Sequence, residues 1–280
     1  MPTTTTKRSR GPLAVGLVVV VIAAIVVAFL FTRKSNQSSS SPTSAVLGSA
    51  VPQDVLARVT DIPESVLTKV GVNPALVSPP QVIKGGRPLT LNGKPELLYV
   101  GADFCPYCAA ERWAIVGALS KFGTFKGLEL MESSGTDVYP DTNTFTFVHA
   151  SYSSPYLSLV TREIETRTHA PLQTLTAKEN DLLQIYDVPP YVPTTQDDGS
   201  IPFVDFANKF VIDGASYSPQ VLAGLNWQTI AATLSDPSSP VAKSIGGTVN
   251  EITAAVCVMT HNQPGSVCKT SLIQSLQKKL

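Results

Sequence analysis

Cysteine is scarce in this chain, with 4 residues among 280. A chain of this length buries a core without disulfides, so it is not a small disulfide-stapled scaffold. The cysteines form two local pairs, Cys105 with Cys108 and Cys257 with Cys268. An even number in close pairs favours an oxidising compartment.

An excess of positive charge is also absent. Lys and Arg total 21 and Asp and Glu total 21, so no strongly basic surface is available for nucleic acid. His149, His169 and His261 lie far apart and lack the spacing of metal ligands. The pair Gly85-Gly86 lacks the Lys-Ser/Thr of a phosphate-binding loop. We therefore predict no nucleic-acid partner, no metal and no cofactor.

Charge is missing from one long stretch near the N-terminus. From Gly11 to Phe31 no charged side chain occurs, and Val, Leu, Ile, Ala and Phe dominate. About 20 such residues in a helix cross a hydrocarbon core of about 30 Å, so a transmembrane anchor is predicted at 11–32. Three basic residues precede the stretch and two follow it, which favours a cytoplasmic N-terminus. The prediction is a single-pass protein of the cell membrane with an extracytoplasmic main domain.

Removal of this segment as a signal peptide is the alternative. The apolar region of a signal peptide normally runs about 7 to 15 residues and ends at a small-residue site. Here the stretch is longer and ends at Arg33-Lys34, although cleavage at Gly48-Ser49-Ala50 stays open. Both interpretations export the rest of the chain.

Residues 33–50 form a Ser-rich tether, and the part of the chain after it has the pattern of an α/β domain. Asn92-Gly93 predicts a tight hairpin turn, and the strand after it, 96–102, leads into the first cysteine pair. Apolar spacing predicts a helix over 109–122, and 144–152 alternates β-forming residues as the second strand of a βαβ unit.

A polar, partly helical insertion is predicted at about 155–200, after which the core pattern resumes. Two short apolar runs around Ala207-Asn208 indicate a second hairpin. The other expected elements are helices at 51–60, 63–70, 177–186, 219–234 and 241–259 and strands at 201–206 and 209–212.

The motif Cys105-Pro106-Tyr107-Cys108 lies where the predicted strand ends and the helix begins. At a helix N-terminus, unpaired N–H groups and the positive end of the helix dipole favour a thiolate, which makes Cys105 the expected nucleophile. Cys108 lies in the first helical turn and is the expected resolving thiol. Phe104 and Tyr107 are expected to form an apolar rim for a substrate chain.

Other roles of a CxxC pair stay open. The same spacing occurs in zinc ribbons, metal chaperones and inert disulfides, so a purely structural disulfide is one alternative and a zinc site of all four cysteines is another. Export disfavours zinc, because thiols outside the cytoplasm tend to oxidise. The coincidence of export, a preceding strand and a following helix favours redox chemistry.

The sequence Phe-Cys-Pro-Tyr-Cys at 104–108 resembles the active-site motif of the thioredoxin superfamily, with the Pro-Tyr dipeptide usual in glutaredoxins. The segment 200–203 resembles the loop whose proline is cis in that superfamily, and the insertion is placed as in periplasmic DsbA-like oxidases. The resemblance implies that the backbone of Ile201 hydrogen-bonds an extended substrate. It also implies that Pro202 packs near the first sulfur of the motif.

The anchor, the Ser-rich tether and the run at 101–113 resemble a bacterial and archaeal family classed as domain of unknown function 929. Together the resemblances predict an α/β, thioredoxin-like fold (βαβ, helical insertion, ββα) with an N-terminal transmembrane helix and a C-terminal helical extension. The predicted parts are a cytoplasmic N-terminus at 1–10, the anchor at 11–32, the tether at 33–50, a helical preface at 51–80, the thioredoxin-like domain at 81–234 and the extension at 235–280.

The sequence departs from the thioredoxin pattern at one position. Thioredoxins and several relatives carry a buried carboxylate six residues before the first cysteine, but Tyr99 occupies that position here. Asp103 and Glu111 are the nearest carboxylates, and strand alternation and helix phase are expected to leave both at the surface. Transfer of the resolving thiol's proton must therefore be arranged differently.

The second pair, Cys257 and Cys268, brackets a turn-rich stretch between two predicted helices. We expect a structural disulfide that stabilises a C-terminal helical hairpin by about 2 to 3 kcal/mol, because it constrains the unfolded chain. A relay role, in which this pair exchanges with Cys105 and Cys108, is the alternative.

These observations predict a membrane-anchored extracytoplasmic thiol–disulfide oxidoreductase that acts on exported proteins, with oxidase or isomerase favoured over reductase. An oxidase needs a membrane redox partner, for which a quinone-linked protein is expected, and a reductase needs an electron donor across the membrane. The non-enzymatic alternative is an exported binding or assembly module whose oxidised CxxC motif braces a surface.

Overall fold

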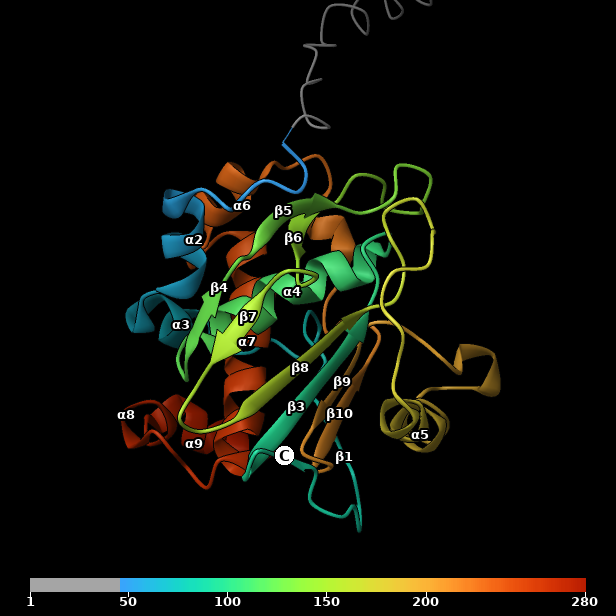
Figure 1. Ribbon diagram of the computed structural model, residues 1–280. Coiled ribbons are helices and arrows are strands. Elements are labelled where there is room, and N and C mark those ends of the chain that lie inside the picture. The colour runs from blue at the N-terminus through green and yellow to red at the C-terminus, as the bar shows by residue number, and fades with distance from the viewer. Residues whose placement is uncertain (1–45) are drawn as a thin grey trace, which may run out of the picture. The chain divides into compact units, whose positions relative to one another are not determined.

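A mixed sheet forms the centre of the computed structural model, which describes residues 46–280 (Figure 1). The sheet contains β1 (Gln81–Val82), β2 (Thr90–Leu91), β3 (Lys94–Gly101), β8 (Ser158–Glu163), β9 (Phe203–Phe206) and β10 (Phe210–Asp213). Its order is β1-β10-β9-β3-β2, with β8 also paired to β3. The β3–β8 ladder is parallel and the β3–β9 ladder antiparallel, so β3 joins the two kinds of pairing.

Two separate pairs of short antiparallel strands lie between the first long helix and β8 in the chain. They are β4 (Thr124–Lys126) with β7 (Ser151–Ser153), and β5 (Glu129–Glu132) with β6 (Asn143–Thr146). Gly127 separates β4 from β5 with a φ of 72°, and a side chain there would meet the His149 carbonyl. The glycine therefore permits a left-handed turn at a close backbone approach.

Helices cover both faces of the sheet, with α4 and α7 on one face and α5 on the other (Figure 1). The helices are α2 (Gln53–Thr60), α3 (Glu64–Val70), α4 (Pro106–Leu119), α5 (Ala177–Tyr186), α6 (Trp227–Thr233), α7 (Pro240–Met259), α8 (Gly265–Cys268) and α9 (Ser271–Gln277). Short 3-10 turns occupy Thr195–Asp197 and Pro219–Leu222.

Alternation along β3 divides the core between these two faces. Leu97 and Tyr99 join the large apolar cluster that contains the side chains of α4 and α7. Leu98 and Val100 point to the opposite face and pack in the cluster that includes Leu182 of α5. Successive side chains of a strand point to opposite faces, so a central strand covered on both sides is apolar throughout.

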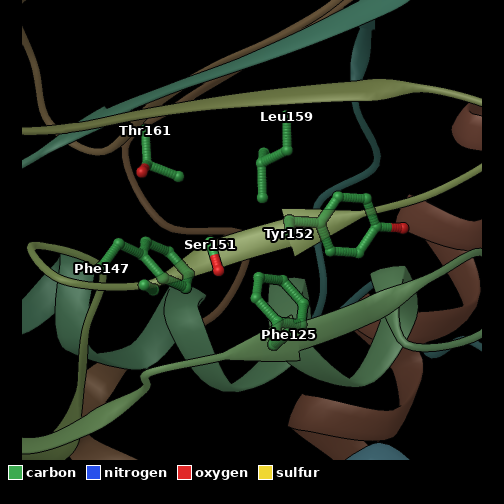
Figure 2. Close-up of a pocket in the computed structure, with 7 residues that line it drawn as sticks. Phe125, Phe147, Ser151, Tyr152, Leu159 and Thr161 are labelled. Carbon is green, nitrogen blue, oxygen red and sulfur yellow. The ribbon is translucent and has the colours of Figure 1, made fainter.

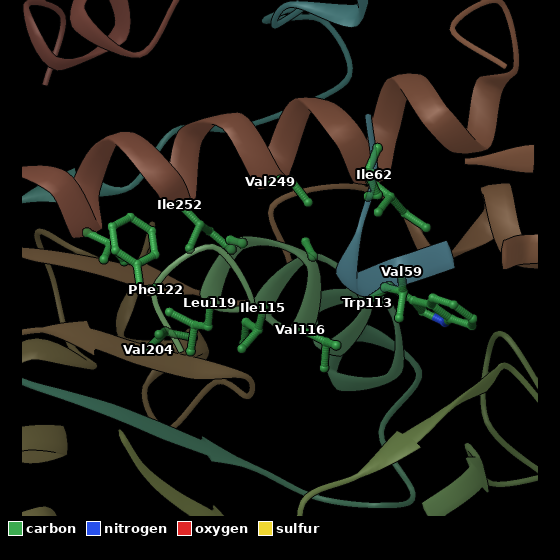
Figure 3. Packing of buried hydrophobic residues seen from close by; sticks show 14 of the residues in the cluster. Val59, Ile62, Trp113, Ile115, Val116, Leu119, Phe122, Val204, Val249 and Ile252 are labelled. Carbon is green, nitrogen blue, oxygen red and sulfur yellow. The ribbon is translucent and has the colours of Figure 1, made fainter. Parts of the chain in front are cut away.

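The close contact of α4 with α7 builds most of the larger cluster. A methyl group at Gly117 of α4 would come 3.0 Å from Val249 of α7, so the glycine lets the helices approach. Figure 3 shows Val249 and Ile252 of α7 pointing toward α4, and Ile115 and Leu119 of α4 belong to the same cluster. Apolar side chains packed at such density stabilise the fold by about 25 cal/mol for each Å² removed from water.

The predicted fold class is wrong as stated. The second strand of the parallel unit is not 144–152 but β8, which starts inside the predicted insertion. Residues 144–152 divide between β6 and β7, because a turn at Val148-His149 interrupts the run, and each half pairs locally. The result is a mixed α/β structure with a mixed sheet.

The structure does not bear out the transmembrane helix that was part of the predicted fold class. Among residues 46–280, no helix combines the length and the apolar character needed to cross a bilayer. The anchor predicted at 11–32 and most of the tether at 33–50 lie outside the described residues.

Candidate functional site

Cys105 caps the N-terminus of α4. Its sulfur accepts a hydrogen bond from the backbone N–H of Cys108 at 3.2 Å, because an N-cap side chain faces the unpaired N–H groups of the first turn. Pro106 follows in the first turn, where its missing N–H leaves no bond unmade. Both cysteines are free thiols, and Cys105 is 4% exposed whereas Cys108 is 0% exposed.

The two thiols differ in their tendency to ionise. Burial raises the pKa of Cys105, but hydrogen bonds from Cys108 and the charge of Arg112 outweigh burial and leave the pKa below that of an ordinary cysteine. Burial also raises the pKa of Cys108, and there it holds the pKa well above the ordinary value, with Cys105 adding to the rise. Cys105 is therefore the thiol that ionises first, and Cys108 retains its proton.

A loop distant in sequence contacts the cysteines. The Ile201–Pro202 peptide is cis, and the Ile201 carbonyl oxygen lies 3.6 Å from the Cys105 sulfur. Ile201 and Phe104 pack against a small cluster of Ala102 and the two cysteines, and Pro202 is buried. The structure thus brings the predicted residues from the motif and from the loop into one site.

Phe104 and Tyr107, which were expected to form an apolar rim, each contact a ring from another part of the chain. Tyr107 is 40% exposed and meets Tyr139 edge to face, with ring centroids 5.9 Å apart. Phe104 stacks on His169 with centroids 4.1 Å apart. Tyr139 and His169 come from separate loops, and no local sequence pattern connects them with the cysteines.

A buried ion pair, which sequence reasoning missed, lies behind the cysteines. Arg112 of α4 donates to Glu163 of β8 from Nε at 2.9 Å and from Nη2 at 2.6 Å, and both side chains are 0% exposed. Nη2 also donates to the Ala102 carbonyl at 2.8 Å. The sequence did offer one signal for Arg112: it is a charged residue four positions after Cys108 in a helix that is mostly apolar. Glu163 lies in the predicted insertion, where the sequence marks no partner for it.

The expectation that Asp103 and Glu111 lie at the surface is wrong. Asp103 is buried with its Oδ1 3.7 Å from Arg112 Nη2. Glu111 accepts bonds from the backbone N–H and the hydroxyl of Ser216 at 2.8 and 3.0 Å, and burial raises its pKa to about 7. The physical reason is that α4 is covered on nearly every side, with Tyr107 its one exposed residue, so helix phase alone does not define a solvent face.

The second cysteine pair forms a disulfide away from this site. Cys257 of α7 and Cys268 of α8 are bonded, with their Cα atoms 5.4 Å apart. Both are fully buried in the large cluster around α7, whereas Cys105 and Cys108 belong to a separate small cluster. The two pairs therefore occupy different environments.

Within residues 46–280, no three His, Cys, Asp or Glu side chains are arranged to hold a metal ion. A cavity of about 250 Å³ lies between the β4–β7 pair and β8 (Figure 2). Its lining comprises Phe125, Phe147, Ala150, Ser151, Tyr152, Leu159 and Thr161, so the cavity is separate from the cysteine pair.

A model of the family described as a domain of unknown function, DUF929, matches residues 81–258. The chain belongs to this family. The match includes the sheet, the CxxC motif, the Ile201–Pro202 loop and nearly all of α7. No curated protein and no solved structure matches the chain. The family description carries no activity.

Proposed function

We propose that the chain is a thiol–disulfide oxidoreductase that acts on exported proteins through Cys105 and Cys108. The observation that carries the proposal is the inequality of two free thiols at the N-terminus of α4: Cys105 caps the helix and is 4% exposed, whereas Cys108 is 0% exposed. The Cys105 thiolate attacks a substrate disulfide and forms a mixed disulfide, which Cys108 resolves. The reverse sequence transfers the disulfide to a substrate dithiol, and this oxidase or isomerase direction is the one we favour.

The surroundings of Cys105 support a polypeptide substrate. The cis Ile201–Pro202 loop lies against the sulfur, and Phe104 and Tyr107 provide apolar surface beside it. In this proposal the backbone of Ile201 binds an extended substrate segment. A relationship to the thioredoxin superfamily is part of the proposal and rests on residues 104–108 and the proline loop.

The compartment and the redox partner are part of the same proposal. The bonded Cys257–Cys268 pair supports an oxidising, extracytoplasmic location, where disulfides persist. Repeated oxidation of substrates then requires a membrane redox partner that reoxidises Cys105 and Cys108, and a quinone-linked protein fits that role.

The test is the reduction potential of the Cys105/Cys108 pair, measured on the full chain equilibrated in glutathione buffers and read by thiol trapping. A value near about −120 mV supports an oxidant, and one near about −270 mV supports a reductant. A pair that does not exchange with glutathione contradicts the proposal and favours the alternative, a binding or assembly module braced by structural disulfides.

A further inference from the structure

Two aspartates flank the Ile201–Pro202 loop. Asp187 follows α5, and its Oδ1 accepts a hydrogen bond from the backbone N–H of Ser200 at 3.1 Å. Asp213 ends β10, where it lies opposite Phe203 in the antiparallel register with β9. One aspartate is therefore bonded to the residue before the loop, and the other lies across from the residue after it.

The carboxyl groups of these two aspartates lack donors. Asp187 is 1% exposed. Its Oδ2 atom and both carboxyl oxygens of Asp213 are buried, and no group within residues 46–280 donates a hydrogen bond to them when both are ionised. Buried acceptors and charges without partners are costly, so this doubly ionised form is unfavourable. A proton on one carboxyl group supplies the missing donor, because its O–H then bonds to the other carboxylate.

Burial and the closeness of the two carboxyl groups determine when that proton leaves. Burial and the neighbouring Asp213 raise the pKa of Asp187 to about 8, and burial raises the pKa of Asp213 to about 6. The other groups that act on the pair are the Ser200 N–H, which lowers the pKa of Asp187, and the Asp198 carboxylate, which raises it. The pair therefore shares one proton between about pH 6 and about pH 8 and loses it at higher pH.

We propose that Asp187 and Asp213 are positioning residues whose shared proton holds the Ile201–Pro202 loop in place beside Cys105 for polypeptide binding. This inference rests on the proposed function, in which the backbone of Ile201 binds an extended substrate. The O–H bond between the carboxyl groups orients Asp187 toward the loop, and the Ile201 carbonyl oxygen lies 3.6 Å from the Cys105 sulfur. When the proton passes to solvent, the two carboxylates repel each other and Asp187 turns from this position. Polypeptide binding is then weakened, while the cysteine pair itself is unchanged.

The experiment compares two uncharged disulfides on the reduced full chain, at about pH 7 and about pH 9, on either side of the loss of the shared proton. One is an end-blocked peptide of alanine and serine, dimerised through a central cysteine, which engages the Ile201 backbone. The other is dithiodipyridine, a small aromatic disulfide without a peptide backbone. The same Cys105 thiolate attacks both, so the ratio of the two rate constants cancels the ionisation of Cys105. The peptide-to-aromatic ratio is expected to fall on the order of tenfold from the lower to the higher pH, the effect of one lost hydrogen bond.

Asp213→Asn replaces the shared proton by an amide N–H that does not leave, so its ratio should stay at the lower-pH level at both pH values. Asp187→Asn should behave in the same way, because its amide N–H donates to Asp213 while its amide oxygen accepts from Ser200. Asp205→Asn is the matched control. Burial raises the pKa of Asp205 to about 7, but its carboxylate accepts from the backbone N–H of Asn208 in the turn between β9 and β10. This control should show the same fall in the ratio as the unmodified chain.

Folding of every variant is checked by circular dichroism, and the measurement on the unmodified chain needs no variant. An unmodified chain whose ratio is equal at the two pH values overturns the inference. Folded Asp213→Asn and Asp187→Asn variants whose ratio falls as much as that of the unmodified chain also overturn it. Failure of both disulfides to react with the unmodified chain contradicts the proposed function instead, so the two failures are distinguishable.

Discussion

All four cysteines are buried, but the two pairs have different surroundings. Cys257 and Cys268 lie among the apolar side chains that join α7, α8 and α9, and they are bonded to each other. Cys105 and Cys108 are free, and Cys105 sits at a helix N-terminus with a buried ion pair behind the motif. The reactivity expected of a cysteine therefore depends on nearby N–H groups, charges and access, since these determine how readily it ionises.

The largest expected difference between the pairs is in disulfide exchange. Cys105→Ser should abolish exchange with a disulfide probe while the chain remains folded, because the nucleophilic sulfur is lost. The double variant Cys257→Ser with Cys268→Ser should retain exchange at the unmodified rate. Unfolding of Cys105→Ser without any measurable exchange in the unmodified chain would favour the bracing role for the CxxC motif.

The second largest effect is the loss of stability when the buried ion pair behind the CxxC motif is broken, compared with a partly exposed ion pair elsewhere. Arg112→Met should lower the free energy of unfolding by about 3 to 5 kcal/mol, because it leaves Glu163 buried without its partner. Arg162→Met is the control, since the Arg162–Glu179 pair is partly exposed and its loss should cost about 1 kcal/mol or less. Urea denaturation measures both, and equal costs would show that burial of the pair carries no special weight.

The smallest effect concerns the bonded pair. Replacing Cys257 and Cys268 by Ser should lower the free energy of unfolding by about 2 to 3 kcal/mol, since a short loop is no longer closed in the unfolded chain. The reduction potential of the CxxC pair should not change. Thiol trapping during turnover tests the relay alternative: reduction of Cys257–Cys268 in step with Cys105 would support a relay and contradict a purely structural disulfide.

Many local features of the fold were predicted well, although the helix predicted at 219–234 is divided into a 3-10 turn at Pro219–Leu222 and α6 at Trp227–Thr233. The turn at Asn92-Gly93 has φ values of 53° and 74°, as its residue types indicate, and the helix predicted at 177–186 has those bounds. The helix predicted at 241–259 starts one residue earlier, at Pro240. These elements depend on capping, turn residues and apolar spacing, all of which lie within a few positions of one another.

Predictions that required distant pairing failed. The run at 144–152 has the composition of one strand, yet its two halves pair with β5 and β4, and β8 takes the place beside β3. The composition of a segment indicates that it can form a strand, but it does not specify which strand will pair with it. Contacts between distant segments decide which strand pairs with it. The composition of 144–152 was therefore compatible with pairing to β3 and with the two local pairs that the structure shows.

The sequence by itself determined the position of Cys105 before a helix, the early turn that holds Cys108 and the nearness of Cys257 to Cys268, because each depends on neighbours a few residues apart. Only the tertiary structure decided the chemistry behind the motif. Arg112 and Glu163 are 51 residues apart and meet because β8 runs parallel to β3. Burial of the Tyr99 hydroxyl beside them follows from the same pairing, since a side chain's solvent exposure and partners are properties of packing between elements.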